Sequence, residues 1–355
     1  MQSNRRVFIR LATAGTMGGL LSLAVGKDAS RHGIILGTSV APRLKEDDLT
    51  MLRNIGVEAV SIWTSIEDNN LEFMLSMKRR LEAVGIDIYN IGILDLHCDP
   101  TIVLGLPGVE TKIEQYKNYL NNLSRAGIHY TTYAHMANIK VQKIPGYYQT
   151  AQVPLRGSMT REFDLEVARK LPFSHGRVYN EEEIWQSFTR FIRAVMPVAE
   201  KVKVRIGLHP DDPPVDSLEG VARVFRNLAG FERAIEIAGS ENFGLCLCIG
   251  TWAEGGQTMG KDPVEMIRYF GPKGRLFKIH FRNVDQPLPK FREMFVDNGY
   301  LDMYQVMRAL KDVNFRGLII PDHVPGGGNP QVNYSYTLGY IKALRDRVEA
   351  EVRKA

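Results

Sequence analysis

The sequence lacks the features that mark disulfide-bonded, nucleic-acid-binding or disordered proteins. Its 355 residues include three cysteines, Cys98, Cys246 and Cys248, and this small, odd number argues against a disulfide framework. No basic stretch interleaved with aromatic residues is present, because Lys and Arg stand beside Asp and Glu throughout, so we expect no nucleic-acid partner despite the net charge of +5. The hydrophobic share of 44% and the charged share of 24% are typical of globular proteins. The chain is therefore expected to fold.

The N-terminus also lacks an apolar run long enough to span a bilayer comfortably. Arg5 and Arg6 precede an uncharged stretch, residues 11–25, that is rich in Gly, Ala and Thr. This arrangement resembles a twin-arginine export signal, which is read by machinery that moves folded proteins. We predict that residues 1–30 are such a signal, that the twin-arginine export machinery is a partner, and that the protein is periplasmic or extracytoplasmic. The cleavage site stays open.

From Gly33 onward, short β-branched apolar runs alternate with amphipathic segments, a pattern typical of βα units around a parallel sheet. Eight such units predict that residues 31–355 form one α/β domain, a (β/α)8 TIM barrel. The expected strands are Gly33–Gly37, Ala59–Trp63, Asp87–Ile93, His129–His135, Val202–Leu208, Phe243–Cys248, Leu276–Phe281 and Gly317–Pro321. The expected helices are Leu44–Asn54, Leu71–Val84, Lys112–Ala126, Glu181–Glu200, Leu218–Ala238, Pro263–Phe270, Met303–Asp312 and Tyr336–Val352.

One connection is much longer than the others. It covers about residues 137–180, between the fourth strand and its helix, and it is rich in Gly, Pro, Gln and Arg. Long loops inside compact domains usually carry a function. We predict an insertion that serves as a lid or cap, with a disordered surface excursion as the alternative.

Residues with metal-binding side chains end four consecutive predicted strands. They are His209, Cys248, His280 and Asp322, on strands five to eight. The reactive groups of a (β/α)8 barrel gather at the C-terminal ends of its strands, and neighbouring strands lie about 4.8 Å apart. One side chain from each strand can therefore reach a single ion. This predicts a divalent metal ion at the mouth of the barrel.

Cys246 and Cys248 face the same side of the sixth strand, because side chains alternate along a strand. Cys248 lies nearer the mouth, so we assign it as the ligand and Cys246 as a buried side chain one layer deeper, while the reverse assignment stays open. Two imidazoles, one thiolate and one carboxylate suit Mn²⁺, Fe²⁺, Co²⁺ or Zn²⁺, whereas Mg²⁺ and Ca²⁺ prefer oxygen ligands. These donors alone do not choose among the four metals.

The residues around these ligands resemble a known family. Residues 204–214, Val-Arg-Ile-Gly-Leu-His-Pro-Asp-Asp-Pro-Pro, are similar to the fifth-strand motif of the mannonate dehydratases. Segments that begin at Cys248, His280 and Pro321 resemble that family's Cys-Thr-Gly-Ser, His-Leu-Arg-Ser and Pro-Asp-His segments in the same order. The resemblance implies a xylose isomerase-like barrel and a hydro-lyase, a carbon-oxygen lyase of hexuronate breakdown. Such enzymes convert D-mannonate to 2-dehydro-3-deoxy-D-gluconate and water with Mn²⁺ or Fe²⁺.

The resemblance also assigns roles to residues of this chain. The metal ligands become the same four strand-end residues, and the catalytic acid/base pair becomes His323 and Tyr334, with Tyr336 as the alternative tyrosine. Loss of a proton next to a carboxylate leaves extra negative charge that a cation stabilises. The departing hydroxide must itself be protonated, so the reaction needs both a base and an acid. Which residue is the base stays open.

Three residues are candidates for binding the substrate. Arg282 follows a ligand by two positions and could hold a carboxylate bidentately, although an ordinary salt bridge is an equal alternative. His135 ends the fourth strand, and Asp211 follows His209 within the motif. The expected partner is a small-molecule sugar acid, and we also expect a homo-oligomer.

The sequence departs from the family on the substrate side of the site. The family's Arg before Pro-Asp-His is Ile320, its Gly afterwards is Val324, and its segment after strand four is replaced by residues 134–139. Two other functions therefore stay open. A metal-dependent sugar isomerase or epimerase would use a carboxylate on strand four, which is missing here. An exported, non-catalytic sugar-acid-binding protein would not need His323 and Tyr334.

Overall fold

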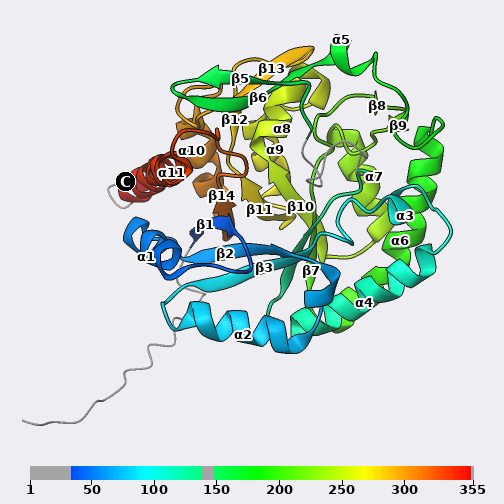
Figure 1. Ribbon diagram of the computed structural model, residues 1–355, viewed down its shortest axis with the longest axis horizontal. Helices are drawn as coiled ribbons and strands as arrows, with labels where there is room; N and C mark the ends of the chain where they lie inside the picture. Colours follow the sequence, from blue (N-terminus) through cyan, green and yellow to red (C-terminus); the bar gives the residue numbers. More distant parts are fainter. Residues whose placement is uncertain (1–32, 138–147, 353–355) are drawn as a thin grey trace, which may run out of the picture. The chain divides into compact units, whose positions relative to one another are not determined.

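The computed structural model describes residues 33–137 and 148–352, and the predicted export signal lies outside them. Eight parallel strands form one curled sheet, and helices surround it (Figure 1). Each strand is followed along the chain by an outer helix. The predicted (β/α)8 barrel is therefore confirmed.

All eight predicted strands are present. They are β1 (Ile34–Val40), β2 (Ala59–Thr64), β3 (Asp87–Ile93), β4 (Tyr130–Tyr133), β7 (Arg205–Leu208), β10 (Phe243–Cys248), β11 (Leu276–His280) and β14 (Gly317–Ile320). The long helices are α1 (Glu46–Ile55), α2 (Leu71–Glu82), α4 (Val109–Arg125), α6 (Glu181–Lys201), α7 (Leu228–Ala238), α9 (Pro263–Phe270), α10 (Met303–Asp312) and α11 (Pro330–Val352). Shorter helical segments are η2 (Ile66–Asp68), α3 (Pro100–Val103), α5 (Leu165–Ala168), α8 (Ile249–Gly255) and η3 (Gly256–Met259).

Helix α6 illustrates how the sequence forms the outer layer. Asn180 caps its first turn: the Asn180 side chain accepts the N–H of Glu183, and the Glu183 carboxylate accepts the N–H of Asn180. Apolar residues three or four positions apart then form one buried face, which includes Ile184, Phe188, Phe191, Ile192 and Val195. This face joins the large apolar core that the helices and strands share.

Side chains join β3 and β4, which stand at the two ends of the strand order and, in the described residues, share no backbone ladder. The Asn90 side-chain oxygen on β3 accepts the backbone N–H of Thr132 on β4 at 3.2 Å. The Tyr119 hydroxyl, on α4, contacts the carbonyl oxygen of Ile91 on β3 and lies 2.6 Å from the Thr131 hydroxyl on β4. Tyr119 therefore links the two strands where the sheet itself does not.

One predicted helix begins later than expected. The prediction placed it over Leu218–Ala238, whereas α7 begins at Leu228. The Asn227 side chain caps α7 by accepting the N–H of the residue three positions on. The preceding residues form a small antiparallel hairpin, β8 (Ser217–Leu218) and β9 (Val221–Ala222). A cap therefore overrides the apolar periodicity that suggested a longer helix.

A second sheet lies at one edge of the barrel, along the top of Figure 1. The described part of the predicted insertion forms a hairpin, β5 (Ala151–Leu155) and β6 (Ser158–Asp164), and residues 138–147 lie outside the described residues. β6 pairs antiparallel with β13 (Lys290–Met294), which pairs with β12 (Asn283–Val284). The sheet therefore unites two loops that leave different barrel strands, an arrangement that the sequence did not predict.

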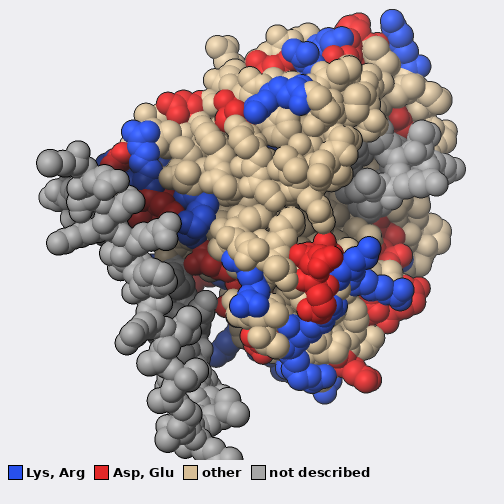
Figure 2. All heavy atoms as spheres, turned by 60° about the vertical axis from the view of Figure 1, so that its left-hand side comes forward, with Lys and Arg blue, Asp and Glu red and all other residues tan. Residues whose placement is uncertain are grey.

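Charged side chains of both signs share the surface. On the face drawn in Figure 2, basic and acidic groups lie next to one another above and below a broad uncharged region. This distribution follows the scatter of Lys and Arg beside Asp and Glu along the sequence. Within the described ranges, no helix is both long enough and apolar enough to cross a membrane.

We expect Tyr119→Phe to lower the free energy of unfolding by about 1–3 kcal/mol, because buried groups on both strands lose a partner. Tyr116→Phe, on the same helix, is the matched control. The Tyr116 hydroxyl is buried without a hydrogen-bond partner among the described residues, so its removal should be nearly neutral. Denaturant titration followed by circular dichroism measures both variants. Equal losses would contradict the proposed link.

Candidate metal centre

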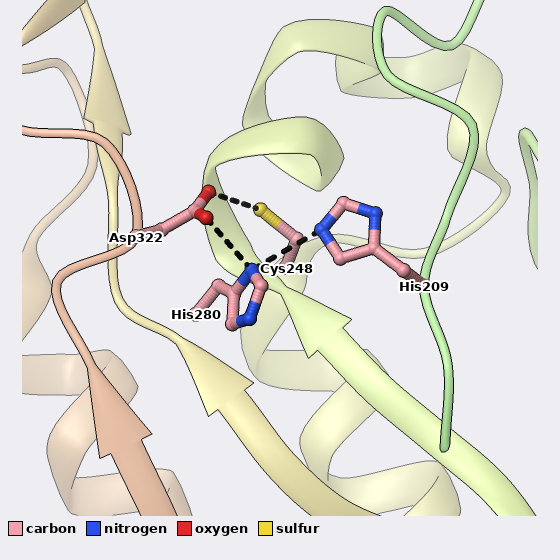
Figure 3. A group of neighbouring side chains, drawn as sticks. All are labelled: His209, Cys248, His280 and Asp322. Carbon is pink, nitrogen blue, oxygen red and sulfur yellow. Dashed lines mark hydrogen bonds and ion pairs between the residues drawn. The ribbon is translucent and has the colours of Figure 1, made fainter. Parts of the chain in front are cut away.

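The ends of four neighbouring strands bring the four predicted ligands together. His209 follows β7, Cys248 ends β10, His280 ends β11 and Asp322 lies just past β14. The strand register places Cys248 beside His280 and His280 beside Ile320. One donor atom from each of the four ligands lies within 4.8 Å of every other. Figure 3 shows the four side chains pointing toward a common centre.

The two imidazoles turn ring nitrogens toward each other. His209 Nδ1 lies 2.7 Å from the carbonyl oxygen of Pro210, so Nδ1 carries the proton and Nε2 is a bare lone pair. His280 Nε2 lies 3.3 Å from the Cys246 sulfur, which can accept its proton and leave His280 Nδ1 bare. His209 Nε2 and His280 Nδ1 are 3.2 Å apart. Two lone pairs at this distance are stabilised by a cation between them.

Cys248 and Asp322 complete the ligand group. Cys248 Sγ lies 3.5 Å from Asp322 Oδ2, and Asp322 Oδ1 lies 3.0 Å from His280 Nδ1. These separations suit donors that share one ion, which are roughly 3.5 Å apart when each bond is about 2.0–2.3 Å long. The Asp322 backbone has a φ of 61°, a left-handed conformation that is strained for a residue with a side chain. The fold maintains this strain, and the carboxylate faces the group. The donor set therefore fits a divalent metal ion.

Burial determines the protonation of these ligands. It lowers the pKa of His280 to about 3 and also lowers the pKa of His209, so both imidazoles are neutral at neutral pH, the form that binds metals. Burial opposes ionisation of Asp322, but His280 and His323 more than offset it and hold the pKa of Asp322 well below its ordinary value. Burial raises the pKa of the Cys248 thiol well above its ordinary value. Cation binding and loss of this thiol proton are therefore coupled.

A buried ion cluster lies against the ligand group. Its members are Arg161 on β6, Asp212 after β7, Glu254 in α8, Arg282 after β11 and Glu293 on β13. The two guanidinium groups have 0% exposed side-chain surface, and each pairs with all three carboxylates. The nitrogen–oxygen distances are 2.7–2.9 Å, apart from a closer contact between Arg282 and Glu293. The cluster thus connects five segments of the chain.

The three buried carboxylates differ in how strongly their surroundings favour ionisation. Burial opposes ionisation of Asp212, but the two arginines lower the pKa of Asp212 far below its ordinary range. Burial likewise opposes ionisation of Glu293, but the arginines and His323 lower its pKa to about 2. Burial, together with the charge of Asp212, raises the pKa of Glu254 well above its ordinary value. Among the three carboxylates, Glu254 is therefore the one whose ionisation its surroundings oppose most.

His323 and Tyr334 both lie near the ligand group. His323 Nδ1 is 2.7 Å from Glu293 Oε1, and His323 Nε2 is 3.9 Å from Asp322 Oδ1. Tyr334 lies in α11, where burial and then the negative charge of Asp322 raise its pKa. Tyr336, the alternative, is exposed and donates its hydroxyl to a different carboxylate at 2.8 Å. Of the two tyrosines, Tyr334 is therefore the one whose pKa responds to the charge of Asp322.

Arg282 reaches the site, but its surroundings differ from those expected. Its Nη2 donates to Asp212 Oδ2 at 2.7 Å, and its Nη1 donates to Glu293. Its Nη2 also lies 3.6 Å from Cys248 Sγ, and its Nε lies 3.5 Å from Asp322 Oδ2. The fully buried guanidinium is occupied by carboxylates of the protein itself. Arg282 thus forms the salt bridge that the sequence analysis gave as the alternative to a substrate carboxylate, and it lies against the metal ligands.

His135 and Asp211 also need correction as substrate-binding candidates. The His135 ring is packed against Phe188 and Phe225, and its Nε2 lies 3.1 Å from the Ser187 hydroxyl on α6. Asp211 is 1% exposed and accepts the backbone N–H of Phe225 at 2.8 Å. Both side chains are therefore engaged in the core.

Four members of the ion cluster were not predicted from sequence as site residues, namely Arg161, Asp212, Glu254 and Glu293. None of them ends a barrel strand. One signal for the buried arginine was present in the sequence. A Cβ atom on Gly250 would come within 2.1 Å of Arg282 Nε, so the glycine of this motif makes room for the guanidinium group.

The barrel interior next to the ligands contains buried polar nitrogens. Lys278 precedes His280 by two residues on β11, and it is 0% exposed. In the described part of the chain, neither Lys278 Nζ nor His97 Nδ1 has a hydrogen-bond partner. Burial, then the charges of His209 and Lys278, lower the pKa of His97 to about 3. Ile320, the position of the family's arginine, is buried in this interior with Leu318.

Sequence comparison identifies relatives that carry one activity. Residues 162–350 match the family model described as D-mannonate dehydratase (UxuA). Mannonate dehydratase 2 of Halalkalibacterium halodurans is 30% identical over 275 residues, which cover 71% of this chain and 78% of that protein. The matched region of the family model contains all four ligands of the candidate metal centre.

Solved structures with the same architecture agree with the barrel. The crystal structure of mannonate dehydratase from Streptococcus suis serotype 2 superposes with a TM-score of 0.77 at 24% identity, over 90% of this chain and 96% of that one. A xylose isomerase domain protein from Planctomyces limnophilus gives a TM-score of 0.58 at 13% identity, over 90% and 99% of the two chains. At these identities the likeness shows the fold, and the predicted xylose isomerase-like barrel is confirmed.

Cys248→Ser should lose bound metal on dialysis, because a weak hydroxyl ligand replaces the thiolate. Cys246→Ser is the matched control. It changes a partner of His280 Nε2 and no direct ligand, so it should keep its metal with an affinity reduced by about 10–100-fold at most. Elemental analysis of the dialysed proteins measures both. Metal loss from the Cys246 variant alone would show that the two cysteines have the opposite roles.

Proposed function

This chain belongs to the mannonate dehydratase family and is a sugar-acid dehydratase, and from that premise we propose that it converts D-mannonate to 2-dehydro-3-deoxy-D-gluconate and water. One observation carries the proposal: four metal-binding side chains converge within 4.8 Å at the barrel mouth, beside a histidine that can exchange protons. This arrangement supports the proposal, because a dehydratase needs a charge-stabilising and a proton-transferring group in one place.

The reaction breaks the C2–H and C3–O bonds of the acid. One group takes the C2 proton and another gives a proton to the departing C3 hydroxyl, so that water leaves and the remaining enol becomes the 2-keto product. Burial raises the pKa of Tyr334, so this residue holds a proton at neutral pH and suits the acid. His323, with Nε2 turned toward Asp322, then suits the base.

His209, Cys248, His280 and Asp322 would hold a divalent cation. When bound, it supplies positive charge that stabilises the carboxylate of the sugar acid as C2 loses its proton. We propose Mn²⁺ or Fe²⁺, and Co²⁺ or Zn²⁺ also suit mixed nitrogen, sulfur and oxygen donors. The neutral state of both imidazoles and the ionised state of Asp322 prepare three of the four ligands in advance.

The protein loaded with Mn²⁺ should release a 2-keto-3-deoxy acid from D-mannonate, which a colorimetric keto-acid assay measures. His323→Ala and Tyr334→Phe should each lower kcat by about 10²–10⁴-fold while the metal stays bound. Tyr336→Phe is the matched control and should stay within about threefold of the unaltered enzyme, because its hydroxyl bonds elsewhere. No keto acid from any aldonate in a panel, with any of the four metals, would overturn the proposal.

We further propose that residues 1–30 are a twin-arginine signal ahead of one barrel domain, residues 31–355, and that the protein is periplasmic or extracytoplasmic. Arg5 and Arg6 before an uncharged, small-residue stretch support this. Export in the folded state lets a metalloprotein take up its ion before it meets a different ion pool.

We also propose a homo-oligomer, because Phe173 and Val178 expose 54% and 53% of their surfaces and suit burial between subunits.

Replacement of Arg5 and Arg6 by lysine should stop export and leave the folded protein in the cytoplasm. Cell fractionation with an activity assay on each fraction measures this. The change lies outside the barrel, so the purified variant should keep its activity. Equal periplasmic amounts of both forms, or no periplasmic protein in either, would overturn the export proposal.

A further inference from the structure

We propose that Glu293 positions His323: it holds the imidazole with a proton on Nδ1, and so makes Nε2 the nitrogen that exchanges a proton with the substrate. The role of Nε2 rests on the proposed function, whereas the contact between Glu293 and His323 does not depend on it. Glu293 is on β13, in the sheet beside the barrel, and it belongs to none of the ligand motifs.

Glu293 and His323 meet from separate parts of the chain. Glu293 Oε1 lies 2.7 Å from His323 Nδ1, and the Glu293 side chain is only 5% exposed. Across the ring, His323 Nε2 lies 3.9 Å from Asp322 Oδ1, one of the ligand atoms. The imidazole therefore has one edge toward Glu293 and the other toward the metal centre.

Two arrangements of protons have to be compared, because Arg282 Nη1 also lies 2.9 Å from His323 Nδ1. If Arg282 donated to a bare Nδ1, the nitrogen lone pair would face the Glu293 oxygen at 2.7 Å with no proton between them. An ionised carboxylate only accepts hydrogen bonds, so that contact would be repulsive. Arg282 Nη1 also has a closer acceptor in the same Glu293 oxygen. The favourable arrangement has Arg282 and His323 both donating to Glu293.

The ion cluster fixes Glu293 in position and in charge. Arg161 Nη2 lies 2.9 Å from Glu293 Oε1, and Arg282 approaches the same oxygen. The strand that carries Arg161 pairs directly with the strand that carries Glu293. The carboxylate is therefore held on both sides and cannot rotate away from His323. Its negative charge stabilises the imidazolium that forms when Nε2 takes a proton.

The test compares two isosteric changes within one cluster. Glu293→Gln places an amide beside Nδ1 that can donate to it, which favours the tautomer with the proton on Nε2. We expect kcat of the Mn²⁺-loaded full chain to fall by about 10²–10⁴-fold, with KM and metal content within about threefold. Glu254→Gln is the matched control. Glu254 pairs with the same arginines, but Glu293 is the member that contacts His323 Nδ1, so Glu254→Gln should lower kcat at least tenfold less than Glu293→Gln does.

A second measurement needs no substrate. In Zn²⁺-loaded, diamagnetic protein with ¹⁵N-labelled histidine, the chemical shifts of the ring nitrogens show which one carries the proton, and His323→Gln identifies the signals. We expect a proton on Nδ1 in the unaltered protein and in Glu254→Gln, and on Nε2 in Glu293→Gln. If Glu293→Gln does not fold, Glu293→Asp keeps the carboxylate and should keep the proton on Nδ1.

A proton on Nε2 in the unaltered protein or in Glu293→Asp would overturn the proposal. Equal falls of kcat in Glu293→Gln and Glu254→Gln would overturn it as well, because they would indicate a general structural role for the cluster. Absence of turnover on any aldonate would instead refute the proposed function. The nitrogen shifts would still decide whether Glu293 orients His323.

Discussion

Two buried arginines hold the functional end of this barrel together. A guanidinium group taken out of water costs several kcal/mol unless carboxylates surround it, so Arg161 and Arg282 require three acidic partners from separate segments. These ion pairs bring four segments together: the hairpin of the second sheet, the loop after β7, helix α8 and strand β13. Because Arg282 also approaches Cys248 and Asp322, the metal ligands depend on the same interaction for their placement.

The barrel and its ligand group could be predicted from the sequence, because they follow from simple rules. Strands and helices differ in the spacing of their apolar residues, so the order of the elements could be predicted. The C-terminal ends of parallel strands meet at one side of a barrel, so strand-end residues such as His209 and His280 could be placed together from the sequence alone. The late start of α7 was not predicted. Its cap at Asn227 is a local signal that competes with an apolar period running through a hairpin.

These rules could not predict the ion cluster. Arg161 and Glu293 are neighbours only because two long loops pair into an antiparallel sheet, and neither loop carries a pattern that specifies its partner. The adjacent acids Asp211 and Asp212 show the same limit on a smaller scale. One accepts a backbone N–H in the core and the other binds both arginines, and the backbone path of the loop decides which is which.

The origin of the four ligands has a consequence for how this barrel can change. All of them come from β7, β10, β11 and β14, whereas β1 to β4 supply none. The first half of the barrel instead carries Trp63 and His97, along with residues 134–137, which belong to one of the three places where the sequence leaves its family's pattern. The two halves of the barrel thus differ in what they contribute to the site. Substitutions in the first half are free to retune which acid is accepted while the cation keeps every one of its donors.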